Sequence, residues 1–219
     1  MKILITEAQL NLIQKELGEE YPSSWNVDEF KKLRSFNQRI QYCQNNLVRL
    51  SSGSSRIVYK IDETKVLKLA KNNKGLAQNE VEIDYGRDYM WDGITAEVFE
   101  YDDNNLWLEM ELARKLTPNE FKRIVGVTFE EFVQTIRYYE NEQKPKSRYY
   151  NPSKPDNYDD MWENEFVYRI LDVIGSYGVP AGDLTRLSTY GIVNRENQDH
   201  VVMVDFGLTN DVYDSYYKK

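Results

Sequence analysis

Residues 201–207 read Val-Val-Met-Val-Asp-Phe-Gly, an apolar run that ends in an acidic residue, an aromatic residue and a glycine. A short apolar run of this kind is typical of a buried strand. With Tyr190–Val193 it predicts a hairpin around the polar turn Asn194–Asp199. Asp205 at the end of this hairpin is either a functional carboxylate or an ordinary turn residue, and the rest of the sequence has to decide between the two.

The composition bounds the class of protein. The chain of 219 residues is 41% hydrophobic and 13% aromatic, which is typical of a globular protein. Its formal net charge of -8 argues against a nucleic-acid partner, because such surfaces are usually basic; the one locally basic patch is Lys144–Arg148. A single cysteine, Cys43, excludes an internal disulfide and fits a reducing compartment. No apolar run reaches the roughly 18 residues that span a membrane, so we expect a cytoplasmic protein.

Helical patterns fill the first 48 residues. Thr6–Gln9 resembles a capping box that starts a first helix. A second helix is expected to begin near Asn26. Its buried face would carry four apolar residues: Phe30, Leu33, Phe36 and Ile40.

Residues 49–112 are predicted to form a strand-rich lobe. Two strand pairs flank one helix, and in chain order the elements are Arg56–Ile61, Lys65–Leu69, the helix Ala77–Tyr89, Ala96–Tyr101 and Leu106–Leu112. A hinge is expected near Leu112, where the period changes again.

Residues 113–219 are predicted to be mainly helical. Thr117 with Pro118 at the first helical position marks a helix start, and a second helix is expected over Thr128–Glu142. The polar segment 141–160 predicts a long loop or lid. A further helix contains Phe166 and ends at Gly178, before the late hairpin. The whole order predicts an α+β fold.

Phosphoryl transfer needs few protein groups: a backbone loop over the phosphates, a lysine that holds them, a carboxylate that orients the lysine, a metal-binding aspartate and a base. The sequence offers a candidate for each, in the same order. Ser51–Arg56 is a Ser/Gly turn, and Lys68 lies on the strand face opposite its two leucine neighbours. Taken alone, each feature also fits a plain hairpin turn or a solvated lysine.

These parts resemble the protein-kinase-like superfamily. Ser51–Lys60 resembles the glycine-rich loop, with only the middle glycine present and Arg56 in the third glycine's place. Gly182-Asp183-Leu184 resembles the loop of aminoglycoside-phosphotransferase-like kinases, and more loosely the His-Arg-Asp loop of protein kinases. Leu67–Ala70 and Asp183–Arg186 are most similar to small kinase-like proteins of bacteriophages, which would place the protein in a host cytoplasm. The resemblance covers residues 50–208.

The resemblance implies a minimal two-lobed kinase-like fold with an added N-terminal helical segment, and ATP and magnesium as cofactors. It assigns catalytic roles to Lys68, to Asp183 as base and to Arg186 as a charge that neutralises the phosphoryl group. The implied nucleotide-binding residues are Gly53, Ser54, Ser55, Lys68, Glu80, Glu111 and Leu112. Here Glu80 is the expected partner of Lys68, with Glu82 as its rival. The implied metal ligands are Asp205, Thr189 and Ser188.

The sequence also departs from the family. Ser188 or Thr189 stands where an asparagine metal ligand is expected, and a hydroxyl is a poorer ligand for magnesium. Asn194 or Asn210 could substitute for it. Ala181 replaces the loop histidine, and no Ala-Pro-Glu segment follows Asp205. Two functions therefore stay open: an ATP-dependent phosphotransferase acting on a hydroxyl of an unidentified protein or small molecule, and a pseudokinase that serves as a nucleotide-binding or protein-interaction scaffold.

Overall fold

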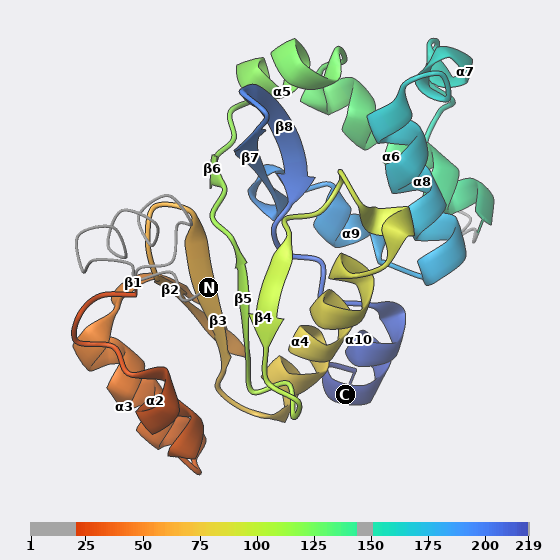
Figure 1. Ribbon diagram of the computed structural model, residues 1–219. Coiled ribbons are helices and arrows are strands. Elements are labelled where there is room, and N and C mark those ends of the chain that lie inside the picture. The colour runs from red at the N-terminus through yellow and green to blue at the C-terminus, as the bar shows by residue number, and fades with distance from the viewer. Residues whose placement is uncertain (1–20, 144–150, 219) are drawn as a thin grey trace, which may run out of the picture.

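The computed structural model describes residues 21–143 and 151–218, and it has an α+β fold (Figure 1). Its larger sheet is antiparallel, with the strand order β1-β2-β3-β5-β4. The bounds of these strands are β1 Val48–Ser52, β2 Arg56–Lys60, β3 Lys65–Ala70, β4 Val98–Tyr101 and β5 Trp107–Glu111. Both predicted strand pairs are confirmed, and β1 is an additional strand.

Alternation along β3 separates two environments. Leu67 and Leu69 pack on the outer face of the sheet, whereas Val66 belongs to the core on the inner face. Lys68 has the same parity as Val66 and is 4% exposed. The lysine therefore lies on the inner face, as its position between two leucines predicts.

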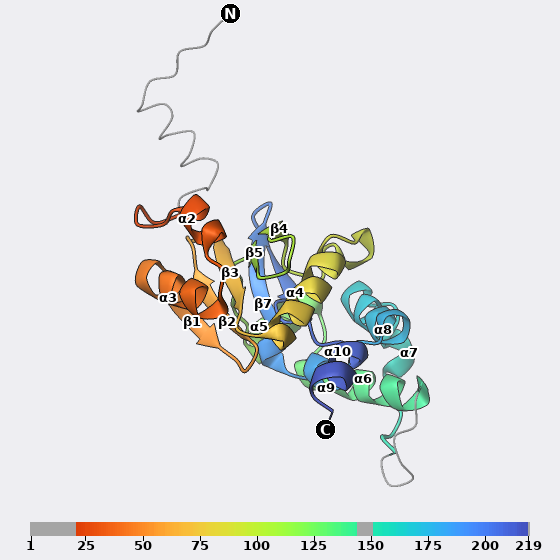
Figure 2. The same ribbon diagram turned by 90° about the horizontal axis from the view of Figure 1, so that it is seen from below.

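Two short helices, α2 Val27–Lys32 and α3 Phe36–Asn46, cover the outer face (Figures 1 and 2). Phe30 of α2 and Cys43 of α3 are buried against the strands. The prediction of one continuous helix through this segment is wrong. The chain breaks because Ser35 forms a capping box with Gln38, which satisfies the first amides of α3 instead of continuing α2.

Helix α4 Asn73–Gly86 packs on the inner side of the sheet. It begins four residues before the predicted start, because the Asn72 side chain caps it by accepting from the Gly75 amide. A Cβ atom at Gly75 would lie 2.4 Å from the Ser55 carbonyl oxygen. Glycine in the first turn therefore lets the helix approach the β1–β2 turn.

The second half contains a three-stranded sheet of order β6-β7-β8 and most of the helices. The strands are β6 Arg114–Lys115, β7 Tyr190–Arg195 and β8 Gln198–Met203. The helices of this half are α5 Pro118–Val125, α6 Phe129–Gln143, α7 Tyr158–Met161, α8 Glu165–Tyr177, α9 Ala181–Leu184, η2 Leu187–Thr189 and α10 Asn210–Tyr216, whereas the short helix η1 Tyr89–Trp91 follows α4 in the first half. Thr117 forms a capping box with Glu120 at the start of α5, which confirms that predicted helix start.

The late hairpin is confirmed, with a tighter turn than expected. Glu196 and Asn197 both have positive φ, at 53° and 63°, as a two-residue hairpin turn requires. The strands therefore extend into the stretch that the sequence assigns to the loop.

The expected first helix at Thr6–Gln9 and the basic patch Lys144–Arg148 lie outside the described residues. No helix within residues 21–143 and 151–218 is long and apolar enough to cross a membrane.

Candidate functional site

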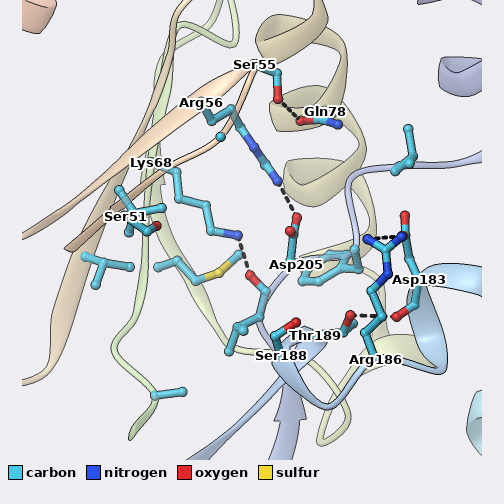
Figure 3. A pocket seen from close by; sticks show the side chains of 18 of the residues that line it. Ser51, Ser55, Arg56, Lys68, Gln78, Asp183, Arg186, Ser188, Thr189 and Asp205 are labelled. Atoms are coloured by element: carbon cyan, nitrogen blue, oxygen red, sulfur yellow. Dashed lines mark hydrogen bonds and ion pairs between the residues drawn. The ribbon is translucent and has the colours of Figure 1, made fainter. Parts of the chain in front are cut away.

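A cavity of about 570 Å³ lies between the large sheet and the second half of the chain. Its lining comes from the β1–β2 turn, β2, β3, the end of β5, α9 and the segment that follows β8 (Figure 3). The Asp-Phe-Gly segment and the Gly-Asp-Leu loop are far from the strands in sequence. The hairpin of β7 and β8 begins after the Gly-Asp-Leu loop and returns the chain beside it, so that Asp205 and the loop both line the cavity.

A buried ion pair forms the floor of the cavity. Lys68 Nζ donates to Glu82 Oε2 at 2.7 Å and to the Val204 carbonyl at 2.6 Å. The expected pairing of Lys68 with Glu80 is wrong, because α4 presents Glu82 to the sheet and leaves Glu80 exposed. Two residues correspond to about 200° around a helix, so only one of the two glutamates can face β3.

Burial and charge together set the ionisation of this pair. Burial would raise the pKa of Glu82, but the charges of Arg56 and Lys68 and their hydrogen bonds outweigh it, so that the pKa is lowered. Burial, helped by the charge of Arg56, lowers the pKa of Lys68, and Glu82 opposes that shift. Glu82 is therefore held as a carboxylate.

Arg56 is the side chain that the sequence leaves without a role in the site. From β2 its guanidinium reaches across the cavity floor. Nη1 lies 2.8 Å from Glu82 Oε2, and Nη2 donates to Glu82 Oε1 at 3.0 Å. Nη2 also donates to Asp205 Oδ1 at 2.6 Å (Figure 3). Its signal in the sequence is a charged residue in the place of a glycine.

Docking on α4 fixes the Asp205–Gly207 segment. The backbone amides of Phe206 and Gly207 both donate to Glu82 Oε1, each at 3.2 Å. The Phe206 ring packs against Trp91 with ring centroids 5.7 Å apart. The side chain of Asp205 is 67% exposed, so it stands at the cavity surface while its backbone is anchored.

The opposite wall carries Asp183 in the short helix α9. Arg186 Nη1 lies 3.1 Å from Asp183 Oδ1. Burial raises the pKa of Asp183, the charge of Arg186 lowers it and the charge of Asp205 raises it, with a net upward shift. A carboxylate with a raised pKa near a cavity is suited to accept a proton.

Part of the cavity lining is apolar, namely Leu50, Val58, Val66, Met110, Leu112, Ala113, Val179, Leu184 and Val204. They make a slot suited to a flat apolar ring. The backbone amides of Glu111 and Leu112 point elsewhere, since they donate to the carbonyls of Glu97 and Thr64 at 2.8 and 2.6 Å. The Glu111 carboxylate pairs with Arg195 at 2.5 Å. Neither amide, nor this carboxylate, is therefore available to a bound ring in this arrangement.

The β1–β2 turn lines the cavity and is fixed by hydrogen bonds to side chains at and near the start of α4. Lys71 Nζ donates to the Gly53 carbonyl at 2.8 Å, and the Asn72 side-chain amide donates to the Ser54 carbonyl at 3.1 Å. The Ser55 hydroxyl donates to Gln78 Oε1 at 2.5 Å. The turn is therefore held against the start of α4.

Every expected site residue except Glu80 lines this cavity. From the strand half these are Gly53, Ser54, Ser55, Lys68, Glu111 and Leu112, and from the other half Asp183, Arg186, Ser188, Thr189 and Asp205. Sequence reasoning assigned no role to Arg56 or to Tyr217, which also line it. Tyr217 comes from the end of α10, where its hydroxyl accepts from the Gln78 amide at 3.2 Å.

Two of the three expected magnesium ligands, Asp205 and Thr189, already have hydrogen-bond partners in this arrangement. Oδ1 of Asp205 already accepts from a guanidinium. The Thr189 hydroxyl donates to the Asp183 carbonyl at 2.6 Å and is turned away from Asp205 (Figure 3). Within residues 21–143 and 151–218, no three histidine, cysteine or acidic side chains converge. Magnesium prefers several oxygen ligands in near-octahedral geometry.

Neither a protein-family model nor a curated protein sequence matches the chain. Solved structures do match, and one belongs to the streptomycin–ATP–APH(2'')-IIa ternary complex. This match covers 94% of the present chain and 72% of that chain, with 10% identity and a TM-score of 0.34. Values this low carry no argument about the activity of this chain.

Proposed function

We propose that the cavity binds a nucleoside triphosphate and that the protein is a kinase-like phosphotransferase acting on a hydroxyl group. The observation that carries the proposal is the buried Lys68–Glu82 pair facing Asp183 and Asp205 across one cavity. Two opposite charges are costly to bury, and removing either one strands the other, so a structural role alone does not require such a pair.

In this proposal the cavity separates a strand-rich lobe, 49–112, from a helical lobe, 113–219. The base of the nucleotide lies in the apolar slot, and the phosphates extend toward Lys68 under the β1–β2 turn. Lys68 holds a phosphate oxygen, since its ammonium is fixed by Glu82 and by the Val204 carbonyl. This placement requires no contact from the amides of Glu111 or Leu112.

The acceptor hydroxyl would approach from the side of Asp183. Its carboxylate accepts the hydroxyl proton as the hydroxyl oxygen attacks the terminal phosphorus. The bond between that phosphorus and the bridging oxygen breaks, and the nucleoside diphosphate leaves. Arg186 is 69% exposed in its side chain and can turn toward the transferred group. The base must be ionised to accept a proton, and the pKa of Asp183 is raised. On acidification the activity should therefore be lost at a higher pH than the pKa of an ordinary aspartate would give.

Thermal unfolding with ATP tests the binding step. ATP at 100 times its dissociation constant should stabilise the wild type by about 2.7 kcal/mol. Lys68→Met should abolish the shift. Lys65→Met is the matched control, because Lys65 lies on the same strand and outside the cavity lining. An unshifted midpoint in the wild type, with or without magnesium, would refute nucleotide binding.

Release of ADP in the presence of a panel of sugars, aminoglycosides and serine peptides tests the chemical step. Asp183→Asn should lower the rate about 10²- to 10⁴-fold while leaving the ATP-induced midpoint shift in place. Equal rates in the wild type and Asp183→Asn would refute the assignment of the base.

A second function is favoured by the ion pair between Arg56 and Asp205. Arg56 already pairs with Asp205, the expected metal ligand. The cleft would then bind a nucleotide without transferring its phosphoryl group, and the protein would act as a scaffold. Under this alternative the wild type shows the ATP-induced shift and no ADP release with any acceptor. Fold alone does not decide between the two functions.

A further inference from the structure

Arg56 gives the cavity floor a second fixed cation. We propose that the Arg56 guanidinium is the built-in cation of this cleft, and that it binds the phosphates of a nucleotide without a divalent metal ion. The inference rests on the proposed function, because it concerns the same cavity.

The charges on the cavity floor balance only when Arg56 is counted. Lys68, Glu82 and Asp205 together carry one net negative charge. Arg56 neutralises it through contacts with both carboxylates. A guanidinium stays protonated at all relevant pH values, and here the charges of Glu82 and Asp205 outweigh the effect of burial and raise its pKa. The position that a metal ion would neutralise is therefore already neutral.

The two contacts of Arg56 differ in how easily they can be exchanged. Glu82 is fully buried, with 0% side-chain exposure, and is held by three groups in addition to the two guanidinium nitrogens. Asp205 is exposed and contacts one nitrogen, Nη2. A phosphate oxygen entering from the cavity can thus replace Asp205 on Nη2 while the contact with Glu82 stays. A guanidinium matches the geometry of phosphate oxygens.

The guanidinium is also positioned before any ligand arrives. Arg56 lies in β2 opposite Ala70, its side chain is 9% exposed, and Asn79 accepts from Nη1 at 3.4 Å. A side chain that is already ordered loses little conformational entropy on binding. By contrast, a divalent ion on Asp205 would lie next to this fixed positive charge and be repelled by it.

Isothermal titration of the full chain with ATP tests the inference, once with EDTA and once with magnesium. The dissociation constant should agree within about threefold between the two conditions. Asp205→Asn should bind ATP in EDTA as tightly as the wild type or several-fold more tightly, because the competing carboxylate is gone.

Arg56→Met should weaken binding at least tenfold. Arg123→Met is the matched control, since Arg123 also pairs with an aspartate, Asp199, but lies outside the cavity lining. It should leave the dissociation constant unchanged. If Arg56→Met does not fold, Arg56→Lys is tested in its place. The ammonium group of lysine cannot bridge Glu82 and a phosphate as the forked guanidinium does, so ATP binding should again weaken.

The outcomes separate this inference from the proposed function. Binding that requires magnesium and is lost in Asp205→Asn overturns the inference and leaves the nucleotide site standing. Undiminished binding by Arg56→Met, or by Arg56→Lys in its place, also overturns it. No binding of ATP in either condition overturns both. The Asp205→Asn result stands whether or not the Arg56 variants fold, because that side chain is exposed.

Discussion

At the scale of single residues, Glu82 holds the two halves of the site together. Its carboxylate accepts from Lys68 and Arg56 of the strands and from the amides of Phe206 and Gly207. It is fully buried, so its loss would remove the acceptor of both backbone amides, while Lys68 and Arg56 would keep only their contacts with Val204, Asp205 and Asn79. The cost of removing one partner from such a network exceeds the cost of an ordinary surface substitution.

Glu82→Gln should therefore lower the free energy of unfolding by about 3–5 kcal/mol, because it leaves two cations short of a buried counter-charge. Glu80→Gln is the control, and its effect should lie within about 0.5 kcal/mol, since Glu80 is exposed on the same helix. Urea denaturation of both variants measures the difference. Equal stability of the two variants would contradict the assignment of Glu82.

At the scale of elements, the segment after β8 and helix α4 are fitted to each other at Gly207. A Cβ atom there would lie 2.5 Å from the Gln78 carbonyl oxygen and 3.0 Å from the Gln78 carbonyl carbon. These are backbone atoms of a helix and cannot move aside cheaply. Gly207 thus allows the close approach that brings Asp205 to Arg56.

Gly207→Ala should lower the free energy of unfolding by about 1–3 kcal/mol, because the added methyl group would be overpacked against the backbone of α4. Gly182→Ala is the matched control for stability, since a Cβ atom there meets no atom within 4 Å. Chemical denaturation distinguishes the two variants. A Gly207→Ala protein as stable as Gly182→Ala would show that the segment does not dock as described.

At the scale of the whole molecule, the two halves are not independent. One apolar core includes Val66 and Leu108 of the large sheet together with Val202 and Phe206 of the second half. The Met203 amide and carbonyl also bond to Ile94 and Ala96, at 2.7 and 2.9 Å. A second core lies between the outer sheet face and helices α2 and α3 (Figure 2). The large sheet is therefore the layer shared by both cores.

Phe30→Ala should lower the free energy of unfolding by about 3–5 kcal/mol, because Phe30 is 1% exposed in the second core. Since the sheet couples the cores, unfolding should stay a single transition. Tyr89→Ala is the control, because Tyr89 is 82% exposed and should contribute within about 0.5 kcal/mol. If near-ultraviolet circular dichroism showed helices α2 and α3 unfolding in a separate transition, the conclusion that the large sheet couples the two cores would be wrong.

Local patterns in the sequence determined much of this protein. The alternation around Lys68 predicts the face on which the lysine lies, and Thr117 with Pro118 predicts the start of α5, because both depend on neighbours within a few residues. The order of the predicted helices and strands along the chain predicted the α+β class. These features follow from periodicity and capping, which are local properties.

Only the tertiary structure decided which groups meet. The choice of Glu82 over Glu80 depends on how α4 is rotated against β3. The contact of Arg56 with Asp205 joins residues 149 positions apart. No local pattern encodes such a contact, because it arises when β7 and β8 carry the chain back across the sheet and burial forces the charges to pair.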